Sequence, residues 1–279
     1  MSYRSIVVHL DASERAAYRL DDALSVARPF RAHLNEVYAV FVPGARAFHL
    51  VAGSTIWFEE HEPRREDRRH SLEHLYHAGL ARSGLSGDWI KDRDQPAQAV
   101  ARRARCADLV IAGQPDPNDP EAYVADHFAE TLVMSSGRPV LLLPYAGVFA
   151  NLGDNVLIGW DASREASRAL YDAPPFLQRA RQVTIVSVNA KTGRVSGSRV
   201  PGADIASALA RHDVRVTVRD IEARADVPVG NVLLSEAERT GANLLVMGGY
   251  GHAHWQEVLL GGATRTLLRS MTVAVLMSH

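Results

Sequence analysis

Short apolar runs alternate along this chain with longer segments whose apolar positions recur at helical spacing. In the first half the apolar runs are residues 5–10, 36–42, 89–92, 109–112 and 140–143. In the second half they are residues 156–160, 183–188, 214–219, 244–247 and 273–277. Helical patterns separate the runs of the first half, at residues 14–29, 66–83 and 97–105. Strands that alternate with helices are typical of an α/β fold with a parallel sheet.

The first and fourth strands of each half are apolar along nearly their whole length. A strand is apolar on both sides when helices cover both faces of its sheet. Ser13 and Ser163 each follow an Asp-Ala pair and precede an amphipathic segment, where a small polar side chain acts as an N-cap. The pattern therefore predicts a doubly wound α/β architecture.

The chain repeats itself. Residues 6–13 (IVVHLDAS) match residues 156–163 (VLIGWDAS) at an offset of 150, and residues 108–113 (DLVIAG) match residues 243–248 (NLLVMG) at an offset of 135. The offset falls by 15 (150 − 135), so the first half carries about that many extra residues. A length of 279 residues also suits two modules of this kind better than one. We expect two tandem domains, residues 1–147 and 148–279, with a linker near residues 145–154.

Two glycine turns near the C-terminus suggest the chemistry of the second half. The apolar run 243–247 leads into Gly248-Gly-Tyr-Gly251, and nine residues later Gly261-Gly-Ala-Thr264 opens a helical segment. Glycine lets backbone amides approach an anion, and a helix N-terminus adds unpaired N–H groups. This favours phosphate binding, although the spacing is neither G-x-G-x-x-G nor a Walker A loop. Two ordinary strand-to-helix turns, which also favour glycine, are the alternative.

The spacing Gly-x2-Gly-x9-Gly-x2-Thr after an apolar strand resembles the nucleotide-binding motif of the universal stress protein family. Met247 and Thr264 match the family pattern, whereas Gly262 stands where the family usually has serine. The resemblance covers nearly the whole chain. It implies two tandem five-stranded, Rossmann-like domains with strand order 3-2-1-4-5, and ATP, AMP or ADP as the ligand, with or without magnesium.

The resemblance also implies a role for each site residue. Asp161 and the backbone around Val188 would contact the adenine, with Met247 and Gly248 beside it, and Tyr250 would stack on the ligand or close over it. The residues around the phosphates would be Gly251, Gly261, Gly262, Ala263 and Thr264. Without the resemblance, Asp161 is equally a cap of the following helix, and Val188 is a core residue on any interpretation.

The first half lacks the residues that the motif provides for binding phosphate. Gly113 is kept, but the offset of 135 places Asp116 and Asp126 where the second half has phosphate-loop glycines, and Ala129 where it has Thr264. Like charges at contact distance cost on the order of 1 to 4 kcal/mol each even when partly screened. We therefore expect a degenerate first domain that binds no nucleotide.

Two further patterns each have two interpretations. His70, His74 and His77 recur at i, i+4 and i+7 beside Glu73, which suits either a divalent metal or a solvated charged helix face. The inserted region 45–58 gathers several large apolar side chains in a loop-like context. Such a patch either contacts a partner or folds back onto the core.

Composition narrows the classes of partner. The 32 acidic residues nearly balance the 31 basic ones, so no strong field attracts nucleic acid. No apolar run reaches membrane-spanning length, and no signal peptide is recognisable, so we expect a cytoplasmic protein with no membrane contact. The single Cys106 excludes an internal disulfide.

Three functions remain: a nucleotide-binding regulatory protein of the stress response, a slow ATP hydrolase, and a structural tandem without ligand. Hydrolysis needs a positioned base and a cation on the phosphates. Near the motif the candidates are His252, His254, Glu257 and Arg265, and there is no lysine. We therefore favour binding without catalysis. The apolar last strands of the two halves predict an intramolecular pseudo-dimer, and a homodimer is the alternative.

Overall fold

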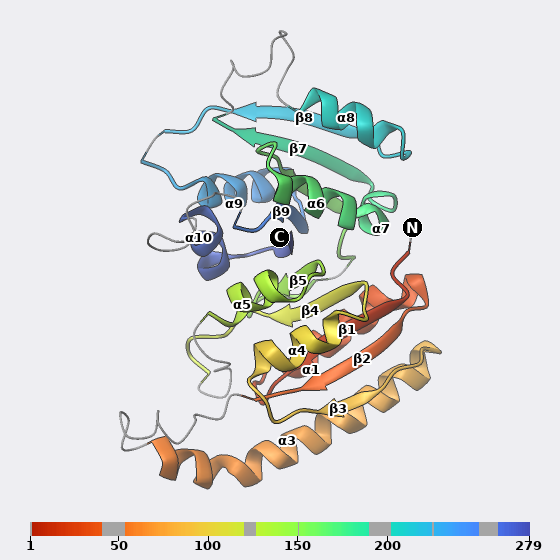
Figure 1. Cartoon of the computed structure of the whole chain (residues 1–279), viewed down its shortest axis with the longest axis vertical. Helices are drawn as coiled ribbons and strands as arrows, with labels where there is room; N and C mark the ends of the chain where they lie inside the picture. Colours follow the sequence, from red (N-terminus) through yellow and green to blue (C-terminus); the bar gives the residue numbers. More distant parts are fainter. Residues whose placement is uncertain are drawn as a thin grey trace. The chain divides into compact units, whose positions relative to one another are not determined.

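The computed structural model describes residues 2–40, 54–119, 127–149, 151–189, 202–224, 226–250 and 262–279; for residues 54–60, 262, 263 and 265 it describes the backbone alone. By their internal contacts the residues form two compact units, Tyr3–Ser136 and Gly137–His279. Figure 1 shows the chain coloured along the sequence.

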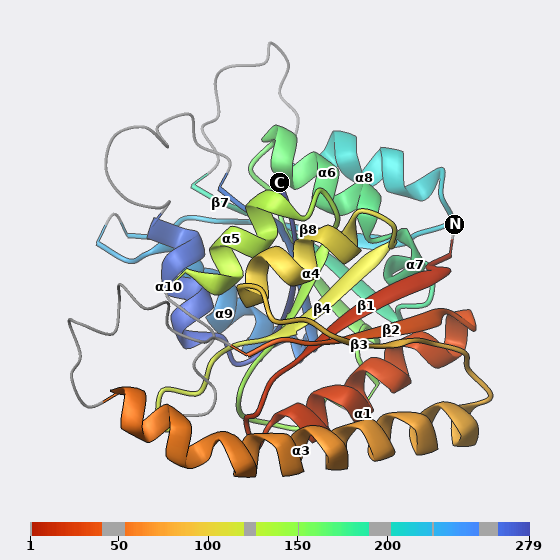
Figure 2. The same ribbon diagram turned by 60° about the horizontal axis from the view of Figure 1, so that its bottom comes forward.

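The unit Tyr3–Ser136 is a parallel sheet with helices on both faces. Its strands lie in the order β3-β2-β1-β4. They are β1 (Ser5–Leu10), β2 (His33–Tyr38), β3 (Trp89–Lys91) and β4 (Leu109–Gly113). The helices are α1 (Ala16–Ala27), the short 3-10 helix η1 (Arg28–Phe30), α3 (Ser54–Ser83), α4 (Pro96–Ala104) and α5 (Phe128–Ser135). Figure 2 shows α1 and α3 side by side on one face of the sheet, with α4 on the other.

The central strands of this sheet are buried on both faces, as their apolar pattern predicts. Every residue of β4 is buried, and so are all residues of β1 except Ser5. Their neighbours Leu34 and Val37 on β2 are buried completely. Burying apolar surface holds the helices against the strands and contributes about 25 cal/mol for each Å² removed from water.

The unit Gly137–His279 contains six strands in the order β5-β10-β9-β6-β7-β8. They are β5 (Val140–Leu143), β6 (Asn155–Gly159), β7 (Gln182–Val188), β8 (Val216–Ile221), β9 (Leu244–Gly248) and β10 (Ala274–Ser278). All are parallel except β5, which pairs antiparallel with β10. The helices are α6 (Arg164–Asp172), α7 (Pro174–Leu177), α8 (Ala203–Ala210), α9 (Val229–Thr240) and α10 (Gly262–Ser270).

The predicted fold class is confirmed. Strands β6 to β10 have the order 3-2-1-4-5 when they are numbered along their own repeat, and β1 to β4 have the order 3-2-1-4. The fifth strand of the first repeat, β5, contacts β10, which is why contacts divide the chain after Ser136. The boundary of the sequence repeats at residues 147 and 148 stays a prediction.

The loop-like interpretation of region 45–58 is wrong in its last part. Helix α3 begins at Ser54 and continues through Pro63, so residues 54–58 are helical, and residues 45–53 lie outside the described residues. The sequence missed this start because the segment shows no helical periodicity and a proline follows it. Within the part of the chain that the structure describes, no helix is both long and apolar enough to cross a membrane.

Candidate functional site

The candidate binding residues lie at the carboxyl edge of the second repeat. Strands β6 and β9 are neighbours, and Gly159 pairs in register with Met247 near their ends. Asp161 therefore follows β6 at the same edge where β9 ends in Gly248. In doubly wound sheets ligands bind at this edge, where the strand order reverses.

The Asp161 carboxylate is exposed at this edge. It accepts a hydrogen bond from the Ser163 amide at 2.9 Å, the only hydrogen bond to it among the described residues. Ser163 caps α6, because its Oγ accepts from the Ala166 amide at 3.1 Å. The predicted N-cap at Ser163 is confirmed, so the capping role weighed for Asp161 belongs to Ser163, and the Asp161 carboxylate keeps free acceptor capacity toward solvent.

Gly248 brings β9 and α6 unusually close together. A Cβ at this position would lie 2.4 Å from the Ala166 amide nitrogen and 2.6 Å from the Glu165 carbonyl carbon. Both are backbone atoms, so any side chain here would displace the start of α6. The glycine of the motif thus has a packing role in addition to any contact with a ligand.

The remaining predicted residues surround the same edge as far as they are described. Met247 is buried, and Val188 at the end of β7 and Tyr250 after β9 are half-buried. Tyr250 has a left-handed backbone, with φ of 60°, which lets the chain turn away from the strand.

The phosphate part of the motif is described only from its second glycine turn onward. Helix α10 begins at Gly262 and includes Ala263 and Thr264, and the Thr264 side chain is buried. The helix N-terminus is therefore formed by the turn that the sequence identified. Gly251 and Gly261, with the loop between them, lie outside the described residues.

The equivalent crevice of the first repeat is closed by its own side chains. The Asp11 carboxylate is buried and accepts hydrogen bonds from the Ser13 amide at 3.0 Å, from Ser13 Oγ, and from Arg19 Nη1 at 3.1 Å. Burial acts to raise the pKa of Asp11, but the Arg19 charge and the other donors hold this pKa below its usual value. Asp11 is therefore a charged, fully engaged carboxylate, unlike Asp161.

Ser13 does not cap a helix, so this sequence prediction is wrong. Its hydroxyl donates to Asp11, and α1 begins only after Arg15, which provides no side-chain cap. The buried Asp11 charge needs every nearby donor, and this demand outweighs helix capping.

Burial also sets the protonation of His9, which lies on β1 two residues before Asp11. Its Nε2 lies 2.8 Å from the Ala39 carbonyl oxygen, and burial lowers the pKa of His9 to about 4, which keeps the ring neutral near pH 7.

Sequence reasoning missed Arg19. A signal existed, since the offset of 150 pairs Arg19 with Ala169, and an arginine opposite an alanine in an amphipathic helix is a marked difference. Of the two acidic residues expected in place of glycines, Asp116 accepts from the Asn118 amide at 2.9 Å within its own loop, and Asp126 lies outside the described residues. Ala129, which stands where the second half has Thr264, lies in α5.

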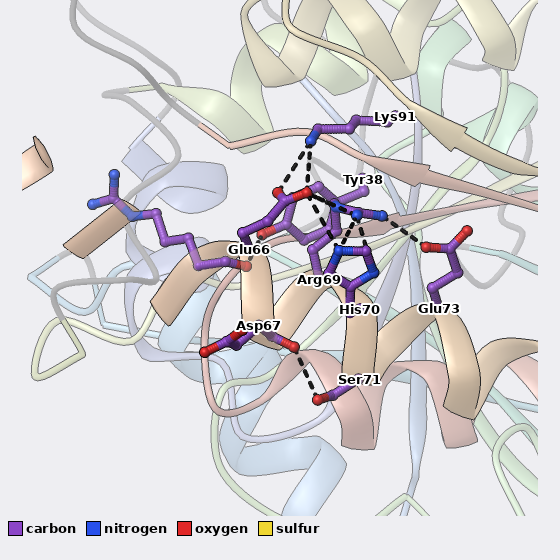
Figure 3. Close-up of polar contacts among 9 residues, drawn as sticks. Tyr38, Glu66, Asp67, Arg69, His70, Ser71, Glu73 and Lys91 are labelled. Atoms are coloured by element: carbon purple, nitrogen blue, oxygen red, sulfur yellow. Dashed lines mark hydrogen bonds and ion pairs between the residues drawn. The ribbon is translucent and has the colours of Figure 1, made fainter. Parts of the chain in front are cut away.

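The histidine face of α3 is a charged surface in this structure. Figure 3 shows Arg69 between Glu66 and Glu73, at 2.8 and 2.7 Å, with His70 beside it and Lys91 on Glu66 at 3.1 Å. The Glu73 carboxylate, which a metal would need as a ligand, is therefore already paired with Arg69. In the described ranges no three potential ligands from His, Cys, Asp or Glu gather closely enough to hold a metal.

These features define a class: a tandem, doubly wound α/β protein in which one terminal aspartate is exposed and the other is engaged by its own chain. Residues 153–279 match the model of the Universal stress protein family, so this domain is a universal-stress-type domain. No protein of curated function matches the sequence significantly.

Solved structures of universal stress proteins share the fold of the whole chain. One from Archaeoglobus fulgidus is 15% identical, covers 98% of this chain and 95% of its own length, and superposes with a TM-score of 0.66. A putative one from Pseudomonas aeruginosa is also 15% identical, covers 99% of this chain and 93% of its own, and has a TM-score of 0.60. At this identity the likeness extends to the fold alone.

Proposed function

We propose that the C-terminal domain binds an adenine nucleotide and that the protein acts as a regulatory protein of the stress response. ATP is the expected ligand, with AMP or ADP in second place and magnesium as an optional companion ion. The observation that carries the proposal is the exposed Asp161 carboxylate next to Gly248, at the edge where this fold binds ligands.

Asp161 is suited to an adenine edge because a carboxylate accepts hydrogen bonds from an exocyclic amine. Since Ser163 already caps α6, ligand binding at Asp161 does not disturb the helix. Val188 and Met247 supply apolar surface beside the ring, and Tyr250 stacks on it or closes over it.

The phosphates belong at the start of α10. Amides of Gly262, Ala263 and Thr264 stand in its first turn, and the positive end of the helix dipole favours an anion there. The motif adds Gly251 and Gly261, because glycine lets a backbone approach an anion closely. Because Gly262 replaces the serine of the family motif, we expect backbone amides to carry most of the phosphate contacts.

Binding without turnover is the expected mode. Residues 241–279 include no lysine, and hydrolysis needs a cation on the γ-phosphate and a base for water. Slow ATP hydrolysis, aided by His254 or Glu257, is the second candidate, and a structural tandem without ligand is the third. The regulatory function therefore consists of a change in stability or partner choice when nucleotide binds.

Isothermal titration of the full chain with ATP tests the proposal. We expect one nucleotide per chain, about tenfold weaker binding in Asp161→Ala because one charge-assisted hydrogen bond is lost, and no measurable binding in Gly261→Asp, which sets a carboxylate against the phosphates. Asp154→Ala is the matched control, since Asp154 precedes β6 at the opposite edge and pairs with Arg181.

Two equivalent sites, or equal losses in Asp154→Ala and Asp161→Ala, would contradict this assignment. Phosphate release is measured in the same samples, where multiple turnovers per second that disappear in Glu257→Ala would establish the ATPase instead.

A further inference from the structure

We propose that Arg19 is a built-in occupant of the N-terminal crevice, whose guanidinium group takes the place that a ligand takes in the C-terminal one. The comparison with a ligand rests on the proposed function, whereas the occupancy itself rests on the geometry of residues 3–136. The chain would then combine one domain of constant state with one that responds to nucleotide.

The Arg19 guanidinium is buried between β1 and β4. Its side chain is 6% exposed, and its Nη1 lies 3.1 Å from both Asp11 Oδ2 and the His9 carbonyl oxygen. A Cβ on Gly113 would lie 2.3 to 2.4 Å from Nη2, Cζ and Nε. Because these three coplanar atoms lie at nearly equal distances from the Cβ position, the guanidinium turns its face toward Gly113.

This placement reproduces the chemistry of a planar nitrogenous ligand. A guanidinium group is flat, carries N–H donors on its edge and stacks through its face. The edge of Arg19 meets the carboxylate at the end of β1, and its face covers the glycine at the end of β4. An adenine ring held by Asp161 would present the same kind of donor edge to its carboxylate.

Arg19 has no counterpart at the matching position of the C-terminal repeat. The offset of 150 places Ala169 at the position of Arg19, and Ala169 is completely buried in α6. Gly248 is approached by the backbone of α6 in place of a guanidinium. The arginine at this position pairs with Asp11, and the alanine at the matching position leaves Asp161 without an arginine partner among the described residues.

Further internal contacts lie near the start of α1 in the N-terminal unit. Asp119, from the segment after β4, accepts a hydrogen bond at 2.9 Å from the Glu14 amide, just before α1. Arg68 of α3 donates at 2.6 Å to the carbonyl oxygen of Ala12, between these groups. A carboxylate near the start of a helix stands where an anion would bind, so the chain supplies both a cationic and an anionic substitute for a ligand.

Chemical rescue tests the proposal in the full chain without any nucleotide. Arg19→Ala leaves the buried Asp11 charge unpaired and should lower the Tm by roughly 5 to 10 °C. Millimolar ethylguanidinium should restore part of this loss in a saturable way, and ethylammonium, which is charged but not planar, should restore less. Asp11→Ala combined with Arg19→Ala should show no rescue. Arg102→Ala, which removes an exposed ion-paired arginine of the same unit, is the control for non-specific effects.

Equal effects of the two cations, or an equal rise of the Tm in the wild type, would overturn the proposal. If Arg19→Ala does not fold, NMR of the wild type decides. The Arg19 guanidinium protons should exchange slowly and keep their chemical shifts when ATP saturates the protein, and fast exchange or an ATP-dependent shift would refute the occupancy. Failure of the C-terminal domain to bind ATP leaves the rescue result unchanged, so the two proposals fail separately.

Discussion

Glu36 is the least satisfied charged side chain in the described part of the protein. It lies on β2 beneath α3, is completely buried, and neither carboxylate oxygen has a hydrogen-bond partner of ordinary geometry among the described residues. Burial raises the pKa of Glu36 well above 4.5, and the Glu73 charge raises it further. The Ile90 amide and the Arg69 guanidinium lower this pKa less, because Arg69 is engaged by Glu66 and Glu73.

The contribution of Glu36 to stability should therefore fall as the pH rises above about 4.5. Between that value and the raised pKa of Glu36, the native state binds more protons at this group than the unfolded state, so this contribution to the free energy of unfolding decreases by up to about 1.4 kcal/mol per pH unit. Above the raised pKa this contribution is constant. Glu36→Gln removes the titrating group, so its stability advantage over the wild type should be small near pH 4.5 and grow with pH.

Urea unfolding at a series of pH values measures this difference. Asp22, whose pKa burial raises to about 6, titrates equally in both proteins and cancels from the comparison. A difference between wild type and Glu36→Gln that does not change with pH would show that Glu36 is ionised in the folded state.

At the scale of elements, the approach of α6 to β9 depends on Gly248. In Gly248→Ala the new Cβ meets backbone atoms that have no freedom to rotate away, so α6 must shift and the free energy of unfolding should fall by about 1 to 3 kcal/mol. Nucleotide affinity should fall with it, because α6 follows Asp161 directly. Thermal unfolding followed by circular dichroism, together with titration of ATP, measures both effects.

Gly159→Ala is the matched control, since Gly159 ends the neighbouring strand β6. Its Cβ would lie 3.2 Å from a methyl carbon of Leu233, a side chain that rotates more easily than a backbone moves. Should the two variants lose similar stability, the close approach at Gly248 would not be the cause.

At the scale of the whole molecule, β5 protects the edge of β10. The two strands pair antiparallel, with Leu141 opposite Leu276, and both strands are buried along their whole length. A fragment of residues 150–279 lacks β5 and exposes an apolar strand edge, which favours pairing with a second copy. We expect this fragment to dimerise or aggregate in size-exclusion chromatography with light scattering, with the full chain as the control. A soluble monomeric fragment would contradict this.

Much of the architecture follows from local patterns in the sequence. Apolar runs located the strands, and the offsets of 150 and 135 revealed the tandem repeat that the strand order reflects. The motif around Gly248 identified the carboxyl edge of β9, and Ser163 was recognised as a helix cap. Each of these signals lies within a few neighbouring residues, where backbone periodicity and turn chemistry act directly.

Only the tertiary structure decided which polar groups meet. Arg19 contacts Gly113, far away in the sequence, and the burial of Asp11 turned Ser13 from a cap into a partner of this carboxylate. Glu36 stands beside Asn35 in a strand of mixed polarity, and only the packing of α3 buries its carboxyl group. Hydrophobic periodicity is encoded residue by residue, whereas the burial and pairing of a charge depend on which distant elements cover it.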